Sequence, residues 1–131
     1  QAQGKLEAAE PLYREALDGF REKSGDQHPG TLSSINNLAL LLQAQGKLEK
    51  AEPLYRVALD GRREKLGDQH PDTLTSISSM ASLLQAQGKL EAAEPLYREA
   101  LDGFREKSGD QHPGTLSSIN NLALLLQAQG K

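Results

Sequence analysis

The side chains with the clearest chemical potential in this chain are three histidines that recur at a fixed interval. His28, His70 and His112 each stand directly before a proline, 42 residues apart. A zinc site needs several ligands that converge on one ion, and its histidines commonly lie a few residues apart. Single histidines at so wide an interval would not converge. We therefore predict that they shape turns or cap helices, and that the chain binds no metal or cofactor.

Hydrolytic chemistry is the second possibility, because Asp26, His28 and Ser34 supply the residue types of an acid–base–nucleophile triad. Neither a nucleophile-elbow sequence nor an oxyanion-hole sequence accompanies them, and the chain has no glycine-rich phosphate-binding loop. Cysteine is absent, which excludes thiolate catalysis, disulfide bonds and thiolate metal ligands. We predict that the protein is not an enzyme and has no catalytic residue.

The charge pattern argues against two classes of partner. The chain has 15 basic and 18 acidic residues, a net charge of −3, and the two signs are interspersed. That distribution offers no basic patch for nucleic acid and no polybasic segment for a membrane surface. No apolar run approaches the roughly 18 residues of a membrane-spanning helix, and no signal peptide opens the chain. We expect a cytoplasmic protein, and its first residue, Gln1, suggests an excised fragment.

Internal repetition dominates the organisation of the sequence. A unit of 42 residues occupies 1–42, 43–84 and 85–126, and residues 127–131 begin a fourth copy. The first and third units are identical, and the second differs from them at ten positions. Such identity is typical of a very recent duplication or of an engineered array. We predict one repeat array over residues 1–131.

Each unit is predicted to form two helices, called helix A and helix B. Helix A begins after the His-Pro turn, where Pro29 suits the first helical position. It ends near Gln45, before Gly46, which can adopt the left-handed conformation of a helix stop. Its apolar residues follow the i, i+3, i+4 spacing of one helical face. They are Leu32, Ile35, Leu38, Ala39 and Leu42.

Helix B is predicted to run from about Lys47 to Leu66, with charged residues on its outer face. Pro53 removes one backbone hydrogen bond inside this helix, and Gly61 weakens it by about 1 kcal/mol relative to alanine. β-branched residues are few, so strands are not expected. The inward-facing residues are Leu48, Ala51, Tyr55, Ala58 and Leu59.

The order of large, small and aromatic residues in these two helices resembles the tetratricopeptide repeat. The segment NNLALLLQAQGKLEKAEPLYRVALDGRREKLGDQHPDTL is similar to the repeats of kinesin light chain, and the likeness recurs over the whole chain. The unit has 42 residues in place of the usual 34, and Ile35 and Leu48 stand where the family has aromatic residues. The resemblance implies an all-α, right-handed superhelical α-solenoid of antiparallel helix pairs, with six helices in the order B-A-B-A-B-A.

The differences between the units define one side of helix A. Four of them fall at positions 33, 36, 37 and 40, and at the equivalent positions of the second unit. This i, i+3, i+4, i+7 spacing belongs to one helical stripe, roughly opposite the core face. Packing therefore restrains one side of helix A and leaves the other free. In tetratricopeptide proteins that free side lines a concave groove, so the resemblance implies a groove here.

We expect a protein or peptide in this groove. Asparagine offers a donor and an acceptor that suit the backbone of an extended peptide, and kinesin light chain repeats carry similar asparagines. Lysine and arginine are absent from these positions, so a clamp for a terminal carboxylate is not expected. The other interpretation is that these are simply solvated polar residues. The candidates are Ser33, Asn36, Asn37, Gln43, Thr75, Ser78, Ser79, Gln85, Ser117, Asn120 and Asn121.

The two ends of the array are predicted to carry complementary apolar surfaces. The first helix B lacks its helix A and the last helix A lacks its helix B, whereas terminal repeats normally carry polar caps. Head-to-tail association would bring Leu122 and Leu126 of one molecule against Tyr13 of the next, as an open chain. The candidate end-to-end residues are Leu6, Tyr13, Leu17, Ile119, Leu122 and Leu126.

Two functions therefore stand beside each other, and a third has no support. The first is a protein-interaction scaffold whose concave helix-A face binds a peptide or a partner helix. The alternative is an excised or engineered structural array without a ligand, which associates head to tail. The repeat identity and the uncapped ends favour this alternative. Nothing in the sequence supports the third, an enzyme.

Overall fold

The computed structural model describes residues 11, 14–15, 18 and 29–130. The chain divides into two compact units, residues 1–65 and residues 66–131. Within the described ranges, the regular elements are all helices, which confirms the all-helical prediction for that part of the chain. None of these helices is both long and apolar enough to cross a bilayer.

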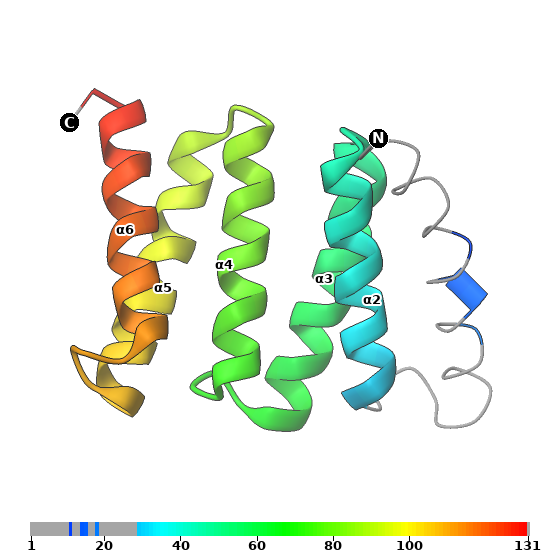
Figure 1. Ribbon diagram of the computed structural model, residues 1–131, viewed down its shortest axis with the longest axis horizontal. Coiled ribbons are helices and arrows are strands. Elements are labelled where there is room, and N and C mark those ends of the chain that lie inside the picture. The colour runs from blue at the N-terminus through cyan, green and yellow to red at the C-terminus, as the bar shows by residue number, and fades with distance from the viewer. Residues whose placement is uncertain (1–10, 12–13, 16–17, 19–28, 131) are drawn as a thin grey trace. The chain divides into compact units, whose positions relative to one another are not determined.

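Helices of 16 and 19 residues alternate along the described chain (Figure 1). The 16-residue helices correspond to the predicted helix A and the 19-residue helices to helix B. The first unit holds α2 and α3, apart from the last residue of α3, and the second holds α4, α5 and α6. Their bounds are α2 Pro29–Ala44, α3 Leu48–Leu66, α4 Pro71–Ala86, α5 Leu90–Ser108 and α6 Pro113–Ala128.

The A helices stop at a left-handed glycine, as predicted. At the end of α2, the Gly46 amide donates to the Gln43 carbonyl at 2.9 Å and the Lys47 amide donates to the Leu42 carbonyl at 2.8 Å. Gly46 has a φ of 82°, a conformation that costs glycine little and other residues more. The same two bonds close α4 at Gly88. These bonds satisfy carbonyls that the helix leaves without a partner.

The recurrent histidines cap the A helices at their other end. Nδ1 of His70 accepts a hydrogen bond from the Asp72 amide at 3.0 Å, and Nδ1 of His112 accepts one from the Gly114 amide at 2.9 Å. Both histidines have extended backbone, and a proline follows each as the first helical residue. The capping prediction is confirmed for these two residues, and His28 lies outside the described residues.

The cap at α6 leads to a measurable prediction. His112→Ala removes the acceptor for the Gly114 amide and the ring that stacks on Phe104, whose centroid lies 6.1 Å away. We expect the free energy of unfolding to fall by about 0.5–2 kcal/mol. His112→Asn restores a capping acceptor without the ring and should recover most of the loss in urea unfolding. Equal losses in the two variants would show that the cap contributes nothing.

The B helices continue through their internal prolines. Pro53 and Pro95 are each the sixth residue of their helix, so each removes one backbone donor near the helix start. The terminal turns compensate, because an acidic residue stands in the first turn and basic residues stand in the last turn. Charges in that order interact favourably with the helix dipole.

The core of the first unit lies between α2 and α3. Ile35 and Tyr55, for which burial was predicted, are both fully buried. Leu32 packs where α3 has Gly61, and a Cβ added at Gly61 would lie 2.6 Å from Cδ2 of Leu32. The glycine that weakens the isolated helix therefore admits a leucine side chain. The other buried apolar residues include Leu38, Ala39, Leu42, Ala51, Ala58 and Leu59.

The second unit repeats this arrangement and adds one helix. α5 packs against both α4 and α6, and Figure 1 shows it behind these two helices. A Cβ added at Gly103 of α5 would lie 2.5 Å from Cδ2 of Leu74, which is fully buried. The buried apolar residues of this unit include Ile77, Met80, Ala81, Leu83, Ala93, Tyr97, Ala100 and Leu101.

Candidate functional site

Three residues of α2 form an exposed stripe on the side away from the core. Ser33 and Asn37 are exposed, and Leu40 keeps 46% of its surface exposed. The three positions cover about 60° of the helix circumference at 3.6 residues per turn. A leucine so exposed contributes little to the core and offers apolar surface to another molecule. We call these positions, with their equivalents in α4 and α6, the A-face stripe.

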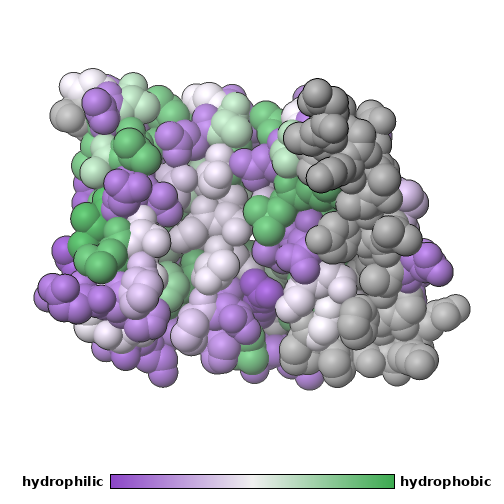
Figure 2. All heavy atoms as spheres, viewed as in Figure 1, coloured by the Kyte–Doolittle hydropathy of each residue, from purple (hydrophilic) through white to green (hydrophobic). Residues whose placement is uncertain are grey.

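In the second unit the A-face stripe differs between the two A helices. On α4 it consists of Thr75, which is exposed, and Ser79 and Ser82, which are half-buried. These are small hydroxyl residues, and Figure 2 shows side chains of near-neutral hydropathy along α4. The stripe of α4 therefore offers hydrogen-bonding hydroxyls without a large apolar group.

On α6 the A-face stripe again combines polar side chains with a leucine. Ser117 is exposed, Asn121 is half-buried, and Leu124 keeps 51% of its surface exposed. Apolar patches are visible over this helix in Figure 2. Since a half-exposed leucine stands at the same repeat position in α2 and α6, the stripe combines polar and apolar side chains. The sequence prediction stressed only the polar ones.

Positions 36, 78 and 120 are equivalent in the three A helices and lie at the edge of the stripe, and their exposure differs. Asn36 is only 6% exposed, and its Oδ1 is buried with no hydrogen-bond partner. Ser78 is half-buried and Asn120 is exposed. Position 36 lies about 60° from position 33, toward the core face. An external ligand could therefore reach Asn120 in this conformation, but Asn36 would be reached only after neighbouring side chains move.

The two glutamines among the candidates are engaged by tyrosines. The hydroxyl of Tyr55 donates to Oε1 of Gln43 at 2.7 Å, and that of Tyr97 donates to Oε1 of Gln85 at 3.0 Å. Each bond links the last turn of an A helix to the B helix that follows it in the chain. The sequence holds a signal for this pair, because glutamine and tyrosine recur twelve residues apart in every unit. Sequence reasoning treated the tyrosines only as core residues.

Burial of these phenols changes their acidity. Desolvation raises the pKa of Tyr55 to about 12. Burial also raises the pKa of Tyr97, and a hydrogen bond with Ser82 lowers it in part. Both phenols are therefore neutral near neutral pH. Their hydroxyls act as hydrogen-bond donors that hold the glutamines in place.

The A-face stripe contains no charged side chain, but one cation lies at its border. Nη2 of Arg62, on α3, donates to Oγ of Ser33 at 3.3 Å, and Arg62 is only 8% exposed. Exposed ion pairs occur elsewhere on the B helices, between Arg56 and Glu52 and between Arg98 and Glu94, both at 3.0 Å. Such helix-surface pairs contribute little stability. The stripe thus favours uncharged ligand groups.

The predicted end-to-end residues fall into three groups. Ile119 is 37% exposed and Leu126 is half-buried, whereas Leu122 is only 7% exposed. Leu122 belongs to the same repeat position as Leu38 and Met80, which are also buried. Sequence reasoning overlooked Leu116, which is 48% exposed on α6. The remaining candidates, Leu6, Tyr13 and Leu17, lie outside the described residues.

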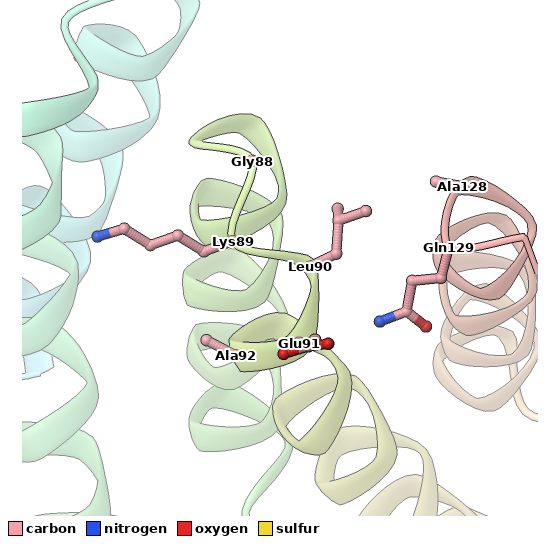
Figure 3. Close-up of a pocket in the computed structure, with 7 residues that line it drawn as sticks. All are labelled: Gly88, Lys89, Leu90, Glu91, Ala92, Ala128 and Gln129. Carbon is pink, nitrogen blue, oxygen red and sulfur yellow. The ribbon is translucent and has the colours of Figure 1, made fainter.

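A pocket of about 700 Å³ lies between the start of α5 and the end of α6 (Figure 3). The side chain of Gln129 points toward the first turn of α5, where Glu91 stands. Glu91 and Lys89 both line the pocket, but the side chain of Lys89 points away from Gln129 in Figure 3, so the pocket offers no concentrated charge for an ion. Among the residues that the structure describes, no three histidine, aspartate or glutamate side chains gather as a metal site would require.

Comparison with known protein families identifies one family along the chain. The family model for the tetratricopeptide repeat matches residues 1–64, 32–106 and 72–131. No curated protein matches the chain.

Several solved structures share the fold over nearly the whole chain. BtubC (BKLC) from P. vanneervenii is 31% identical with a TM-score of 0.86, and the match covers 98% of this chain and 51% of that one. Kinesin light chain nearly identical TPR-like repeats from Podosopora anserina are 27% identical with a TM-score of 0.89, over 99% of this chain and 62% of theirs. A single-residue variant of the latter is 26% identical with a TM-score of 0.82, over 98% and 61%. The chain thus spans less than two thirds of the length of these proteins.

Proposed function

Because the chain belongs to the tetratricopeptide-repeat family and is an array of the kinesin light chain type, we propose that it is a binding scaffold whose A-face stripe receives an extended peptide from a protein partner. Repeats of this family generally mediate protein–protein interaction. The observation that carries the proposal is Leu40, which is 46% exposed on a helix whose opposite face is buried, and Leu124 at the same repeat position of α6 is 51% exposed.

The chemistry of the stripe defines the ligand class. The side-chain amides of Asn37 and Asn121 can each donate to and accept from a peptide backbone. Leu40 and Leu124 can each cover an apolar side chain, and the hydroxyls of α4 suit small or polar groups. Because the stripe itself has no charged residue, and Arg62 at its border is only 8% exposed, a terminal carboxylate or a strongly acidic segment would find no exposed cation on these positions. The ligand is therefore an uncharged peptide segment that combines apolar anchors with exposed backbone.

The proposal is tested by selecting peptides from a displayed random library and measuring their affinities for variants. Leu124→Ser introduces the residue that the second 42-residue repeat, residues 43–84, carries at the equivalent position, Ser82. It should therefore preserve the fold. We expect it to weaken selected peptides about tenfold, because a half-buried leucine contact is lost. Asn121→Ala should weaken them further.

The matched control is Val57→Ser, which also removes a large exposed apolar residue, 40% exposed, but from a B helix. It should leave peptide affinity unchanged. Selected peptides that lose affinity with Val57→Ser and not with Leu124→Ser would contradict the proposed face.

We infer as a second candidate that the chain is an excised or engineered structural array without a ligand, which associates head to tail with copies of itself. The supporting observation is the exposure of Leu116 and Ile119 on α6, positions that are buried in α2 and α4. The same proposal includes the right-handed superhelix of six helices, in the order B-A-B-A-B-A, that the family resemblance implies. Residues 6–24 have the sequence of α5.

A further inference from the structure

One position of the A-face stripe carries different chemistry in the two compact units. In α2 it is Leu40, which is 46% exposed and lies three residues before Gln43. In α4 it is Ser82, which is half-buried and lies three residues before Gln85. Ser82 forms a hydrogen bond with the phenol of Tyr97, whereas a leucine has no polar atom to offer. The same repeat position therefore presents an apolar side chain in one unit and a hydroxyl joined to the core in the other.

The direction of the hydrogen bond at Ser82 follows from the protons available. A phenol has one O–H, and Tyr97 donates it to Oε1 of Gln85 at 3.0 Å. The hydroxyl of Ser82 must therefore donate to the phenol oxygen. The acidity of Tyr97 agrees, because this bond lowers its pKa, as a donor that stabilises the phenolate does. Ser82 thus uses its single proton on Tyr97 and keeps acceptor lone pairs on Oγ.

Tyr97 also fixes the orientation of the Ser82 hydroxyl. It belongs to α5, which packs against α4, and it is only 4% exposed. A serine hydroxyl without such a partner rotates to suit its surroundings, whereas an acceptor that is oriented in advance loses less freedom when a ligand binds. Any group that binds Ser82 through a hydrogen bond must be the donor, because the serine proton is already engaged.

A backbone N–H is the donor that suits this oxygen. Serine is small, so the backbone of an extended peptide can approach α4 closely. A leucine at this position, such as Leu40 in α2, would hold the backbone away and contact a side chain instead. Each residue of a peptide except proline carries one backbone N–H, so the contact depends little on the ligand sequence.

We propose that Ser82 is a specificity-determining residue of the A-face stripe, whose Oγ, oriented by Tyr97, accepts a hydrogen bond from a backbone N–H of the bound peptide. This inference rests on the proposed function and adds the contact made by α4. Tyr97 is a positioning residue, because it touches Ser82 and not the ligand. The peptide residue that lies over Ser82 can carry many side chains but is not proline, which lacks the donor.

Amide-to-ester replacement in the peptide tests the contact, because it removes one backbone N–H without adding bulk. The peptide is one selected on the wild-type chain that loses affinity with Leu124→Ser and therefore binds the second unit. Each amide is replaced in turn, and isothermal titration calorimetry measures the Kd for the wild type and for Ser82→Ala. At one position we expect the ester to weaken binding to the wild type about tenfold and binding to Ser82→Ala less than about twofold.

A matched pair of tyrosine variants tests the positioning role. Tyr97→Phe and Tyr55→Phe each remove a tyrosine–glutamine hydrogen bond, but only Tyr97 orients a serine of the stripe. The effect of the ester should fall to about threefold in Tyr97→Phe and stay at about tenfold in Tyr55→Phe. Ser82→Thr keeps a hydroxyl and should retain the full effect of the ester. Urea unfolding verifies that each variant is folded.

The possible failures are distinguishable. Selected peptides that depend on neither Leu40 nor Leu124 overturn both the proposed function and this inference. Peptides that depend on Leu40 alone retain the proposed function and overturn the role of Ser82. A peptide of the second unit whose esters act equally on the wild type and on Ser82→Ala retains the face and overturns the contact. An equal effect of the ester in the wild type and in Tyr97→Phe overturns the positioning role.

Discussion

Leu74→Ala is expected to lower the free energy of unfolding by about 2–5 kcal/mol, the range for a fully buried leucine. Gly103→Ala, introduced into that variant, is expected to raise it again by about 1 kcal/mol. The reason is the contact between the two residues. With Leu74 in place, a Cβ at Gly103 would lie 2.5 Å from Cδ2 of Leu74. Once that side chain is removed, alanine meets no obstacle there and keeps its helix-propensity advantage.

The contrast with the wild-type background makes this prediction specific. Gly103→Ala alone should destabilise, because overpacking of about 1–3 kcal/mol outweighs the gain of about 1 kcal/mol in helix propensity. Urea unfolding of the four chains measures the coupling directly. The pair Leu32 and Gly61 in the first unit should show the same change of sign. An equal effect of the alanine in both backgrounds would mean that leucine and glycine do not interlock.

The second large effect is expected at alkaline pH. Burial raises the pKa of Tyr55 to about 12, whereas an unfolded tyrosine titrates near 10. The folded state therefore favours the neutral phenol, and this contribution is complete below pH 10. It is lost as the pH rises from about 10 through about 12, where the unfolded chain releases the proton more readily. At 1.36 kcal/mol for each pKa unit, the loss approaches about 3 kcal/mol for this residue, which is fully buried.

The test is the pH dependence of unfolding in the wild type and in Tyr55→Phe. The phenylalanine variant loses the hydrogen bond to Gln43, so its stability near neutral pH should fall by about 1 kcal/mol. Its stability should then decline less steeply between pH 10 and 12. Tyr97→Phe is a matched control in the other compact unit. Its free energy of unfolding should still show the decline between pH 10 and 12 that is due to Tyr55. Parallel curves for the wild type and Tyr55→Phe would show that burial does not hold this phenol neutral.

The helices and most of the core could be predicted from the sequence because their signals are local. Proline after histidine marks the start of helix A, and glycine marks its end, as the structure of Gly46 confirms. The spacing of Leu32, Ile35 and Ala39 defines one face whatever lies against it. The histidine caps follow from the same local chemistry, since an acceptor before a helix meets its free amides.

The exposure of individual positions could not be predicted in the same way. It depends on which neighbouring helix covers each position, and the angle of a residue around its own helix does not determine that. Asn36 and Asn37 are adjacent in sequence, but one is 6% exposed and the other is exposed. Gly61 was predicted only to weaken helix B, because the leucine that fills its place comes from another helix. The exposure of Leu116 was overlooked for the same reason: its equivalents are buried, and only the contacts of α6 distinguish it.

The central claim, a ligand on the A-face stripe, is tested most directly by nuclear magnetic resonance. The side-chain NH₂ groups of Asn37 and Asn121 give separate signals in a nitrogen–proton correlation spectrum, and assignment by Asn→Ser variants identifies them. Addition of a selected peptide is expected to shift the signals of Asn37 and the Leu40 methyls in the first unit, or those of Asn121 and the Leu124 methyls in the second unit, and to leave Val57 unchanged. Shifts confined to Val57 and other B-helix residues would contradict the account.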